Sequence, residues 1–131
     1  GVMGKITKVT EGMTEHFYYA YDDQRNPRIT VCILSVNGTA LAKGTAVCSF
    51  SEPPRRKVGK DKSRGRAIQA LERQKNEYFM RSEAYIVIDS CLAFYNTLMR
   101  PNLLLVAKSC YMPKLTLKEQ KLLSRQETSN E

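Results

Sequence analysis

The stretch RITVCILSVNGTALAKGTAVCSF, residues 28–50, decides the fold. Its first arm, RITVCILSV, alternates β-branched apolar residues with Thr and Cys and then becomes more evenly apolar. Two residues separate it from the second arm. They are Asn37 and Gly38, the dipeptide that best tolerates the positive φ values of a type I′ turn. The pattern therefore predicts a β-hairpin, in which Gly44 of the second arm indicates a bulge.

More strand-like sequence precedes this hairpin. The aromatic run HFYYAY, residues 16–21, has the composition of a strand, and KITKVT, residues 5–10, can pair with it across Gly12. The segment DDQRNP, residues 22–27, is rich in turn-forming residues. We therefore expect an antiparallel meander of about four strands, with one face covered by the rest of the chain.

The spacing of the apolar residues becomes helical after the Pro-Pro pair of SEPPRR. Alanine and leucine recur at helical spacing within residues 62–80, and Asp61 or Ser63 can act as the N-cap. Residues 84–99 are apolar on most sides, which favours a helix in a core or a subunit interface, although their β-branched run IVI also fits a buried strand.

Two further elements follow in the C-terminal part of the chain. Residues 102–112, NLLLVAKSCYM, form a further buried element for which helix and strand both stay open. A last helix is marked by Thr116 and Glu119, which form a capping box. The sequence predicts an α+β fold, with an N-terminal antiparallel β-meander of about four strands packed against two or three helices.

The length of 131 residues predicts a single domain over residues 3–131. Residues 1–2 resemble the remains of a cleaved tag, and residues 126–131 are expected to fray. No signal peptide and no apolar run of about 18 residues is found, so we expect a cytoplasmic protein without a membrane partner. The four cysteines are widely spaced, which favours reduced thiols over a zinc site. They are Cys32, Cys48, Cys91 and Cys110.

Catalytic patterns are weak. His16 is the only histidine and lies in the aromatic strand, where a packed side chain is the expected role. Nothing near it supplies the signature of a nucleophile and its base. The glycines of KVGKDKSRG lack the ending of a phosphate-binding P-loop. We therefore predict no enzyme, no cofactor and no metal.

Positive charge is the strongest functional signal. The net charge is +8, and seven Lys and Arg side chains fall within residues 55–66. Such charge favours anionic partners, and a helix start adds free N–H groups and forked Arg donors that suit phosphate oxygens. Exposure to solvent explains most of the run equally well. The predicted phosphate ligands are Arg64 and Arg66, followed by Arg100, Arg25 and Arg28.

A second signal lies in CLAFYNTLMRP, residues 91–101. Phe94, Tyr95 and Asn96 fall within one helical turn, and an aromatic face beside an amide can stack a base and read its edge. Phe94 also fits an ordinary core position. We predict these three residues as the base-binding part of a nucleotide site.

The order of these motifs resembles a known family. A hairpin ending in GTAVCS, then PPRRKVGKDKSRGRAIQALE, then YMPKLTLKEQKLL, is similar to small bacteriophage proteins, and most to the Thoeris anti-defence proteins that act as nucleotide sponges. The resemblance covers residues 28–123. It implies a non-enzymatic oligomer that binds a cyclic ADP-ribose signal, and in some members cyclic oligonucleotides, and so deprives an immune effector of its activator.

Two functional hypotheses follow. The first is sequestration of a small cyclic nucleotide in phage counter-defence, by a homo-oligomer assembled through residues 84–99, in the host cytoplasm. Tight binding without turnover suits a chain that is rich in arginine and poor in acid–base pairs. The alternative is a basic nucleic-acid-binding accessory protein of a phage or mobile element. Salt dependence separates the two, because many phosphate contacts give a steep loss of affinity with salt.

Overall fold

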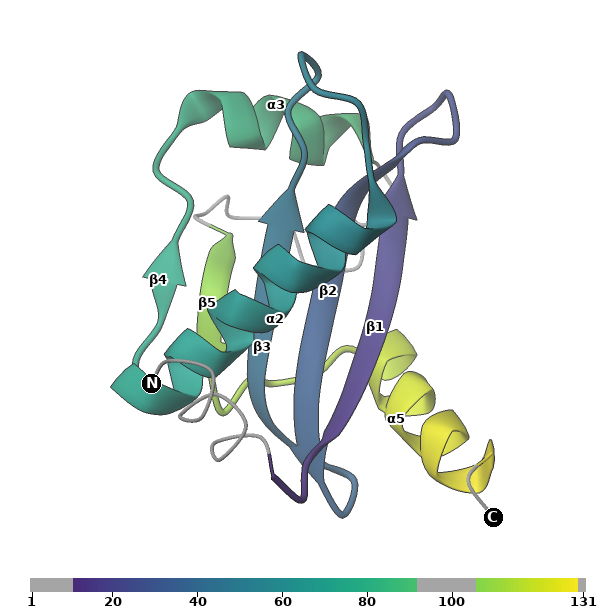
Figure 1. Cartoon of the computed structure of the whole chain (residues 1–131), viewed down its shortest axis with the longest axis vertical. Coiled ribbons are helices and arrows are strands. Elements are labelled where there is room, and N and C mark those ends of the chain that lie inside the picture. Colours follow the sequence, from purple (N-terminus) through teal and green to yellow (C-terminus); the bar gives the residue numbers. More distant parts are fainter. Residues whose placement is uncertain (1–10, 92–105, 130–131) are drawn as a thin grey trace.

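The structure of the protein is a computed structural model that describes residues 11–91 and 106–129. It confirms the α+β class, with a five-stranded antiparallel sheet and helices on both of its faces (Figure 1). The predicted strand over residues 5–10 lies outside the described residues. The elements are β1 (Thr14–Tyr21), β2 (Pro27–Val36), β3 (Thr39–Val47), α2 (Arg56–Arg73), β4 (Glu77–Tyr78), α3 (Ser82–Ser90), β5 (Ala107–Tyr111) and α5 (Leu117–Ser129).

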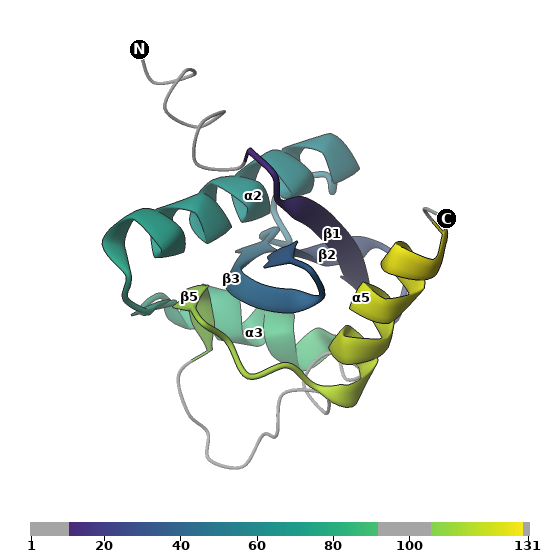
Figure 2. The ribbon, with the colours of Figure 1, turned by 90° about the horizontal axis from the view of Figure 1, so that it is seen from below.

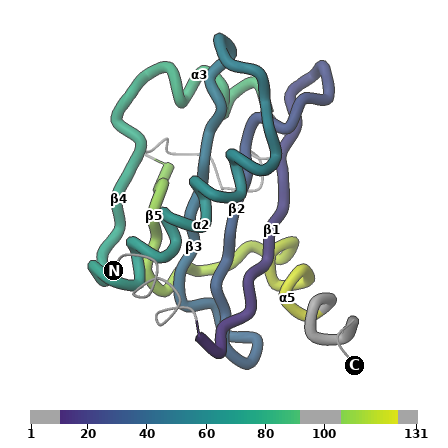
Figure 3. The backbone as a smooth tube through the Cα atoms, in the orientation of Figure 1, coloured from purple at the N-terminus to yellow at the C-terminus, as the bar shows by residue number. Residues whose placement is uncertain are grey.

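The sheet has the order β1-β2-β3-β5-β4, and its first three strands form the predicted meander. Asn37 and Gly38 both adopt the positive φ that a type I′ turn requires, 51° and 80°, so the hairpin prediction is confirmed. The β1–β2 turn and the connection from β3 to α2 lie at the same end of the sheet, and β4 runs outside β5 along one edge (Figure 3).

Gly44 does not mark a bulge, and that prediction is wrong. The register shift between β2 and β3 lies between Leu34 and Ser35 instead. Gly44 is the place where α2 comes closest to the sheet, because a Cβ there would collide with the Ser63 carbonyl oxygen and the Ala67 nitrogen. A glycine in a strand serves either purpose, and here it admits a neighbouring backbone.

The sheet separates two apolar clusters. Helix α2 covers one face, and α3 and α5 lie on the other (Figure 2). The α2 side is built mainly from small residues, which lets the helix approach closely. Its buried members are Cys32, Leu34, Ala42, Ala67, Ile68 and Ala70. The opposite side is larger and holds Ala20, Ile29, Val31, Ile33, Phe79, Ile88, Cys91 and Leu123.

Helix α2 begins and ends earlier than predicted. Its N-cap is Arg55, which makes no side-chain capping bond, whereas Asp61 and Ser63 lie inside the helix. The prediction relied on a capping side chain, and α2 starts without one. The helix ends at Arg73 because Gln74 adopts a left-handed φ of 54°, and the chain then turns into β4.

The other helical predictions are confirmed in part. The β-branched run IVI is helical in α3, which ends at Ser90, and residues 92–99 of the predicted helix lie outside the described residues. The undecided segment contains strand β5. The capping box is confirmed: the Glu119 N–H donates to Thr116 Oγ1, and the Thr116 N–H donates to Glu119 Oε1, both at 3.1 Å.

Glu119 also ties α5 to the sheet from a fully buried position. Its carboxylate accepts a hydrogen bond from the Tyr18 hydroxyl at 2.5 Å and lies 3.0 Å from Lys43 Nζ. Burial works to raise the pKa of Glu119, but the Lys43 charge and these hydrogen bonds together lower it below its ordinary value. Glu119 is therefore an ionised carboxylate inside the protein, held there by its partners.

Candidate anion-binding site

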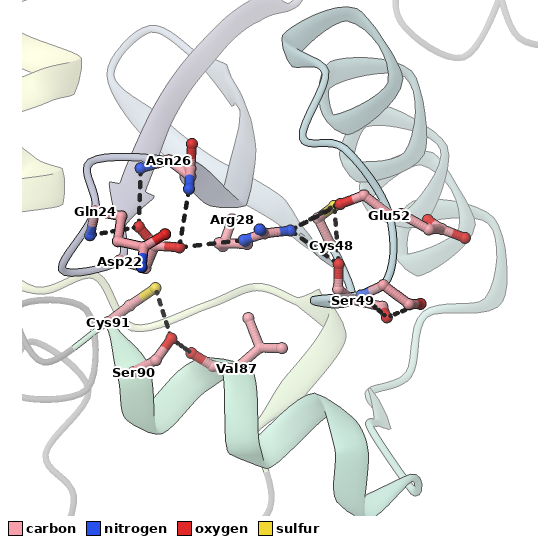
Figure 4. A network of polar contacts seen from close by, with 11 residues as sticks. Asp22, Gln24, Asn26, Arg28, Cys48, Ser49, Glu52, Val87, Ser90 and Cys91 are labelled. Carbon is pink, nitrogen blue, oxygen red and sulfur yellow. Dashed lines mark hydrogen bonds and ion pairs between the residues drawn. The ribbon is translucent and has the colours of Figure 1, made fainter.

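Arg28, a predicted phosphate ligand, is buried and bonded to the protein through its Nε and NH1. Its Nε lies 3.2 Å from Asp22 Oδ2, and its NH1 donates to the carbonyl oxygens of Ser49 and Glu52, both at 2.9 Å (Figure 4). These bonds join the β1–β2 turn to the connection between β3 and α2. The structure therefore gives Arg28 a structural role and leaves its guanidinium few donors for a ligand.

The Asp22 carboxylate organises the same turn. Its Oδ1 accepts the N–H groups of Gln24 and Asn26, both at 2.9 Å. The backbone N–H of Asn26 is the main cause that lowers the pKa of Asp22, with a further contribution from Arg28. Arg25 lies in this turn, exposed and with a positive φ of 65°, and lines none of the cavities described below.

Arg64 and Arg66 do not lie at a helix start as predicted. Since α2 begins at Arg56, both residues lie in its third turn, where the backbone N–H groups are already bonded within the helix. Two residues apart on a helix means roughly 200° of rotation, so their side chains leave α2 in different directions. The structure therefore does not bring the two arginines together.

Arg64 belongs to a row that we call the outer row: Arg56, Lys60 and Arg64. This row lies over strand β1, with the Arg56 guanidinium 5.2 Å from the Tyr19 ring centroid and the Lys60 ammonium 4.9 Å from that of Phe17. Arg64 Nε lies 2.6 Å from Glu15 Oε2. Each cation of the outer row therefore already has a partner on β1.

Arg66 belongs to the inner row, Lys62 and Arg66. Its NH1 donates to the Thr45 carbonyl oxygen at 2.7 Å, and its guanidinium lies 5.4 Å from the Phe79 ring centroid. In the described part of the chain β3 pairs with β5 only over residues 42–44, so this carbonyl has no partner from β5. Arg66 satisfies it. Partial burial lowers the pKa of Arg66, which remains charged at neutral pH.

The inner row borders a cavity of about 480 Å³, which we call the basic pocket. Its lining includes four cationic side chains and two carboxylates. Arg81 and Glu83 pair with each other at 3.5 Å, but Lys62 and Lys108 make no ion pair within the described residues. The lining residues are Val47, Ser49, Ser51, Glu52, Lys62, Arg66, Phe79, Met80, Arg81, Glu83, Ala84, Val87 and Lys108.

Sequence reasoning found this pocket only in part. Arg66 was predicted, whereas Lys62 was one of many charges in the basic run and Lys108 stood in an apolar segment with no signal of its own. They meet because α2 crosses the sheet toward β5. The predicted base ligands Phe94, Tyr95 and Asn96, and also Arg100, lie outside the described residues, so their roles stay predictions.

The described residues contain one pair that resembles a catalytic base and nucleophile. His16 Nε2 lies 2.7 Å from Ser35 Oγ, but both side chains are fully buried, so no substrate reaches them. This agrees with the expected role of a packed strand histidine. Burial also raises the pKa of Cys32 to about 12, which keeps its thiol protonated and unreactive.

No protein-family model, no curated protein and no solved structure matches the chain. Within residues 11–91 and 106–129, no cluster of three or more His, Cys, Asp and Glu side chains could hold a metal ion. None of the helices in these residues has the length and apolarity needed to cross a bilayer.

Proposed function

We propose that the protein binds a small phosphate-bearing nucleotide in the basic pocket and sequesters it without turnover. The observation that supports this proposal best is the pair Lys62 and Lys108, which line the pocket from α2 and β5 without forming an ion pair in the described part of the chain. Arg66, held in place by Thr45, adds a positioned guanidinium. Ammonium and guanidinium groups facing one cavity suit the oxygens of a diphosphate.

The size of the pocket agrees with this ligand class. A cavity of about 480 Å³ lies within the usual range for small-molecule sites, roughly 300–1,000 Å³, and holds a nucleotide more readily than a polymer. Sequestration needs tight binding of the ground state and no group aimed at a transition state. A pocket lined by four cations, of which Arg66 is held in place by the Thr45 carbonyl, meets that need.

The ligand and the biological role extend the sequence prediction. The resemblance to Thoeris anti-defence sponges favours a cyclic ADP-ribose signal, or a cyclic oligonucleotide, removed from a host immune effector in the cytoplasm. A homo-oligomer assembled through residues 84–99 belongs to the same proposal. Helix α3, the described part of that segment, exposes 59% of Ile86, a residue that a subunit contact would cover.

A thermal-shift screen tests the proposed function. The purified protein is heated with cyclic ADP-ribose isomers, cyclic di- and trinucleotides, and a short duplex. A ligand at about 100 times its Kd adds roughly 2.7 kcal/mol of stability, which raises the melting temperature clearly. We expect a shift with a small cyclic nucleotide and recovery of that ligand unchanged. A shift with no small nucleotide, or conversion of the ligand, contradicts the proposal.

Nucleic-acid binding remains a second candidate, supported by the outer row. In the sequence, the basic run and the predicted aromatic helix are far apart, but in the structure the outer row lies beside the β1 rings of Phe17 and Tyr19. Cations beside aromatic rings on an exposed face are typical of single-strand binding surfaces.

The salt dependence of binding separates the two candidates. A polymer that contacts the outer row through several phosphates should lose affinity steeply as salt rises, with a slope of about −0.7 per phosphate for a single strand. A diphosphate held in the basic pocket should show a shallow slope. Binding of an oligonucleotide that Arg56→Ala and Lys60→Ala abolish would favour the second candidate over the first.

A further inference from the structure

A second cavity, of about 360 Å³, adjoins the basic pocket at the end of the sheet. We call it the apolar cavity. Hydrocarbon makes up most of its surface, with walls that include Pro27, Ala46, Pro53 and Val58, and the charged residues Arg28, Glu52, Arg55 and Lys62 lie at its border. It lies between the first turn of α2 and the ends of β2 and β3. Gly59 allows this close approach, because a Cβ there would collide with the Thr30 hydroxyl.

The two cavities share part of their lining. Val47, Glu52 and Lys62 border both of them, so Lys62 lies where the two cavities meet. The connection between β3 and α2 forms a wall of each cavity. Arg28 fixes this connection through the Ser49 and Glu52 carbonyl oxygens, so the wall is shaped before any ligand arrives.

We propose that the two cavities form one bipartite nucleotide site, in which the apolar cavity takes the base and the basic pocket takes the phosphates. This inference rests on the proposed function and deepens it. A nucleotide has a similar division, with a flat base whose faces stack on apolar surface, joined through ribose to a diphosphate. A ligand made of phosphate alone would leave the apolar cavity unused.

Lys62 has a defined place in such a site. Lys62 lines both cavities, and in the proposed site the phosphate nearest the ribose lies beside it. The flexible stem of a lysine can pack along apolar surface while its charge reaches a phosphate. The base then contributes to the affinity of the ligand by burying apolar area, and the phosphates contribute through charge-assisted hydrogen bonds.

Cys48 offers a direct report on the apolar cavity. Cys48 is half-buried and lines this cavity, with its Sγ 3.6 Å from Arg28 NH1. Cys110, which is also half-buried, lies on β5 and lines neither cavity, so it serves as an internal control. Cys32 and Cys91 are buried and should react slowly with any alkylating reagent. A ring in the apolar cavity should therefore slow alkylation at Cys48 alone.

The test compares ADP with inorganic pyrophosphate on the full chain. By titration calorimetry we expect ADP to bind at least tenfold more tightly than pyrophosphate, about 1.4 kcal/mol. Val58→Gln, at an exposed position, should weaken ADP binding severalfold and leave pyrophosphate binding unchanged. Mass spectrometry should show that ADP, and not pyrophosphate, slows iodoacetamide labelling of Cys48 relative to Cys110.

The outcomes separate this inference from the proposed function. If pyrophosphate binds and ADP binds no better, or if ADP leaves Cys48 as reactive as before, the bipartite site is refuted while the basic pocket stands. If neither probe binds and no cyclic nucleotide raises the melting temperature, the proposed function fails together with the inference; if neither probe binds but a cyclic nucleotide raises it, only the inference fails. The labelling of the unmodified protein decides the matter even where Val58→Gln does not fold.

Discussion

The inner and outer rows of α2 carry the same kind of charge on one helix, yet they meet different neighbours. Each cation of the outer row lies against an aromatic ring or a carboxylate of β1. In the inner row, Arg66 supports a free strand carbonyl, and Lys62 faces a cavity across from Lys108. Charge alone therefore does not identify a binding site, and the groups opposite each cation do.

The outer row also shows how a helix can lie along a strand. Its cations are four residues apart, a rise of about 6 Å, and their partners on β1 are two residues apart, a rise of about 6.8 Å. The near match lets three successive cations meet Tyr19, Phe17 and Glu15 in turn. Much of the basic run is thus explained by packing against β1.

Gly44 offers the largest effect, because it fixes the position of the helix that carries both rows. Gly44→Ala should destabilise the protein by about 3 kcal/mol, since the new Cβ would overlap the Ser63 carbonyl and force α2 away from the sheet. Urea unfolding measures the change. Gly65→Ala is the matched control: no atom outside α2 lies near its Cβ, so it should stabilise by about 0.5–1 kcal/mol. Equal effects would disprove the close contact.

Glu119 gives the next largest effect, on the face of the sheet opposite both rows. Its folded-state pKa is lowered, so its contribution to stability is present above the ordinary value of 4.5 and is lost as pH falls below it. Glu119→Gln should cost about 2 kcal/mol at neutral pH, because Lys43 loses its buried partner.

The pH profile identifies the cause of that loss. Unfolding free energies from neutral pH down to about pH 3 should fall less steeply for Glu119→Gln than for the unchanged protein. Ligand affinity should stay the same, because Glu119 lines neither cavity. A parallel pH profile in the variant would show that Glu119 does not carry the acid sensitivity.

Arg66 and Arg64 give a smaller effect that compares the rows directly. Arg66→Ala should cost about 1.5 kcal/mol, because the Thr45 carbonyl loses a charged donor. Arg64→Ala should cost about 0.5 kcal/mol, since its ion pair with Glu15 is partly exposed. Thermal unfolding of the two variants at one salt concentration measures both losses of stability. A larger loss for Arg64→Ala than for Arg66→Ala would contradict the stronger structural role given to Arg66.

Local patterns allowed much of the fold to be predicted. Asn37-Gly38 determines the hairpin, and the capping box of Thr116 and Glu119 determines the start of α5, because each signal acts within a few residues. The start of α2 could not be predicted in this way, because the side chain of its N-cap residue, Arg55, makes no capping hydrogen bond.

The candidate site was harder to predict because it depends on distant residues. Lys62 and Lys108 come together only when α2 crosses the sheet, and no local pattern marks that crossing. Arg28 was selected as a cation, but its partners Asp22, Ser49 and Glu52 become visible only in three dimensions. Composition indicated an anionic ligand, and the fold is needed to propose where it binds.

The most direct test of the central claim compares two double variants of equal charge change. Lys62→Ala with Lys108→Ala alters the basic pocket, and Arg56→Ala with Lys60→Ala alters the outer row. Titration calorimetry with cyclic ADP-ribose and ADP measures the affinity of each. We predict a loss of at least tenfold for the pocket variant, about 1.4 kcal/mol, and a change within about twofold for the outer-row variant. Equal losses, or a larger loss from the outer row, would contradict the account.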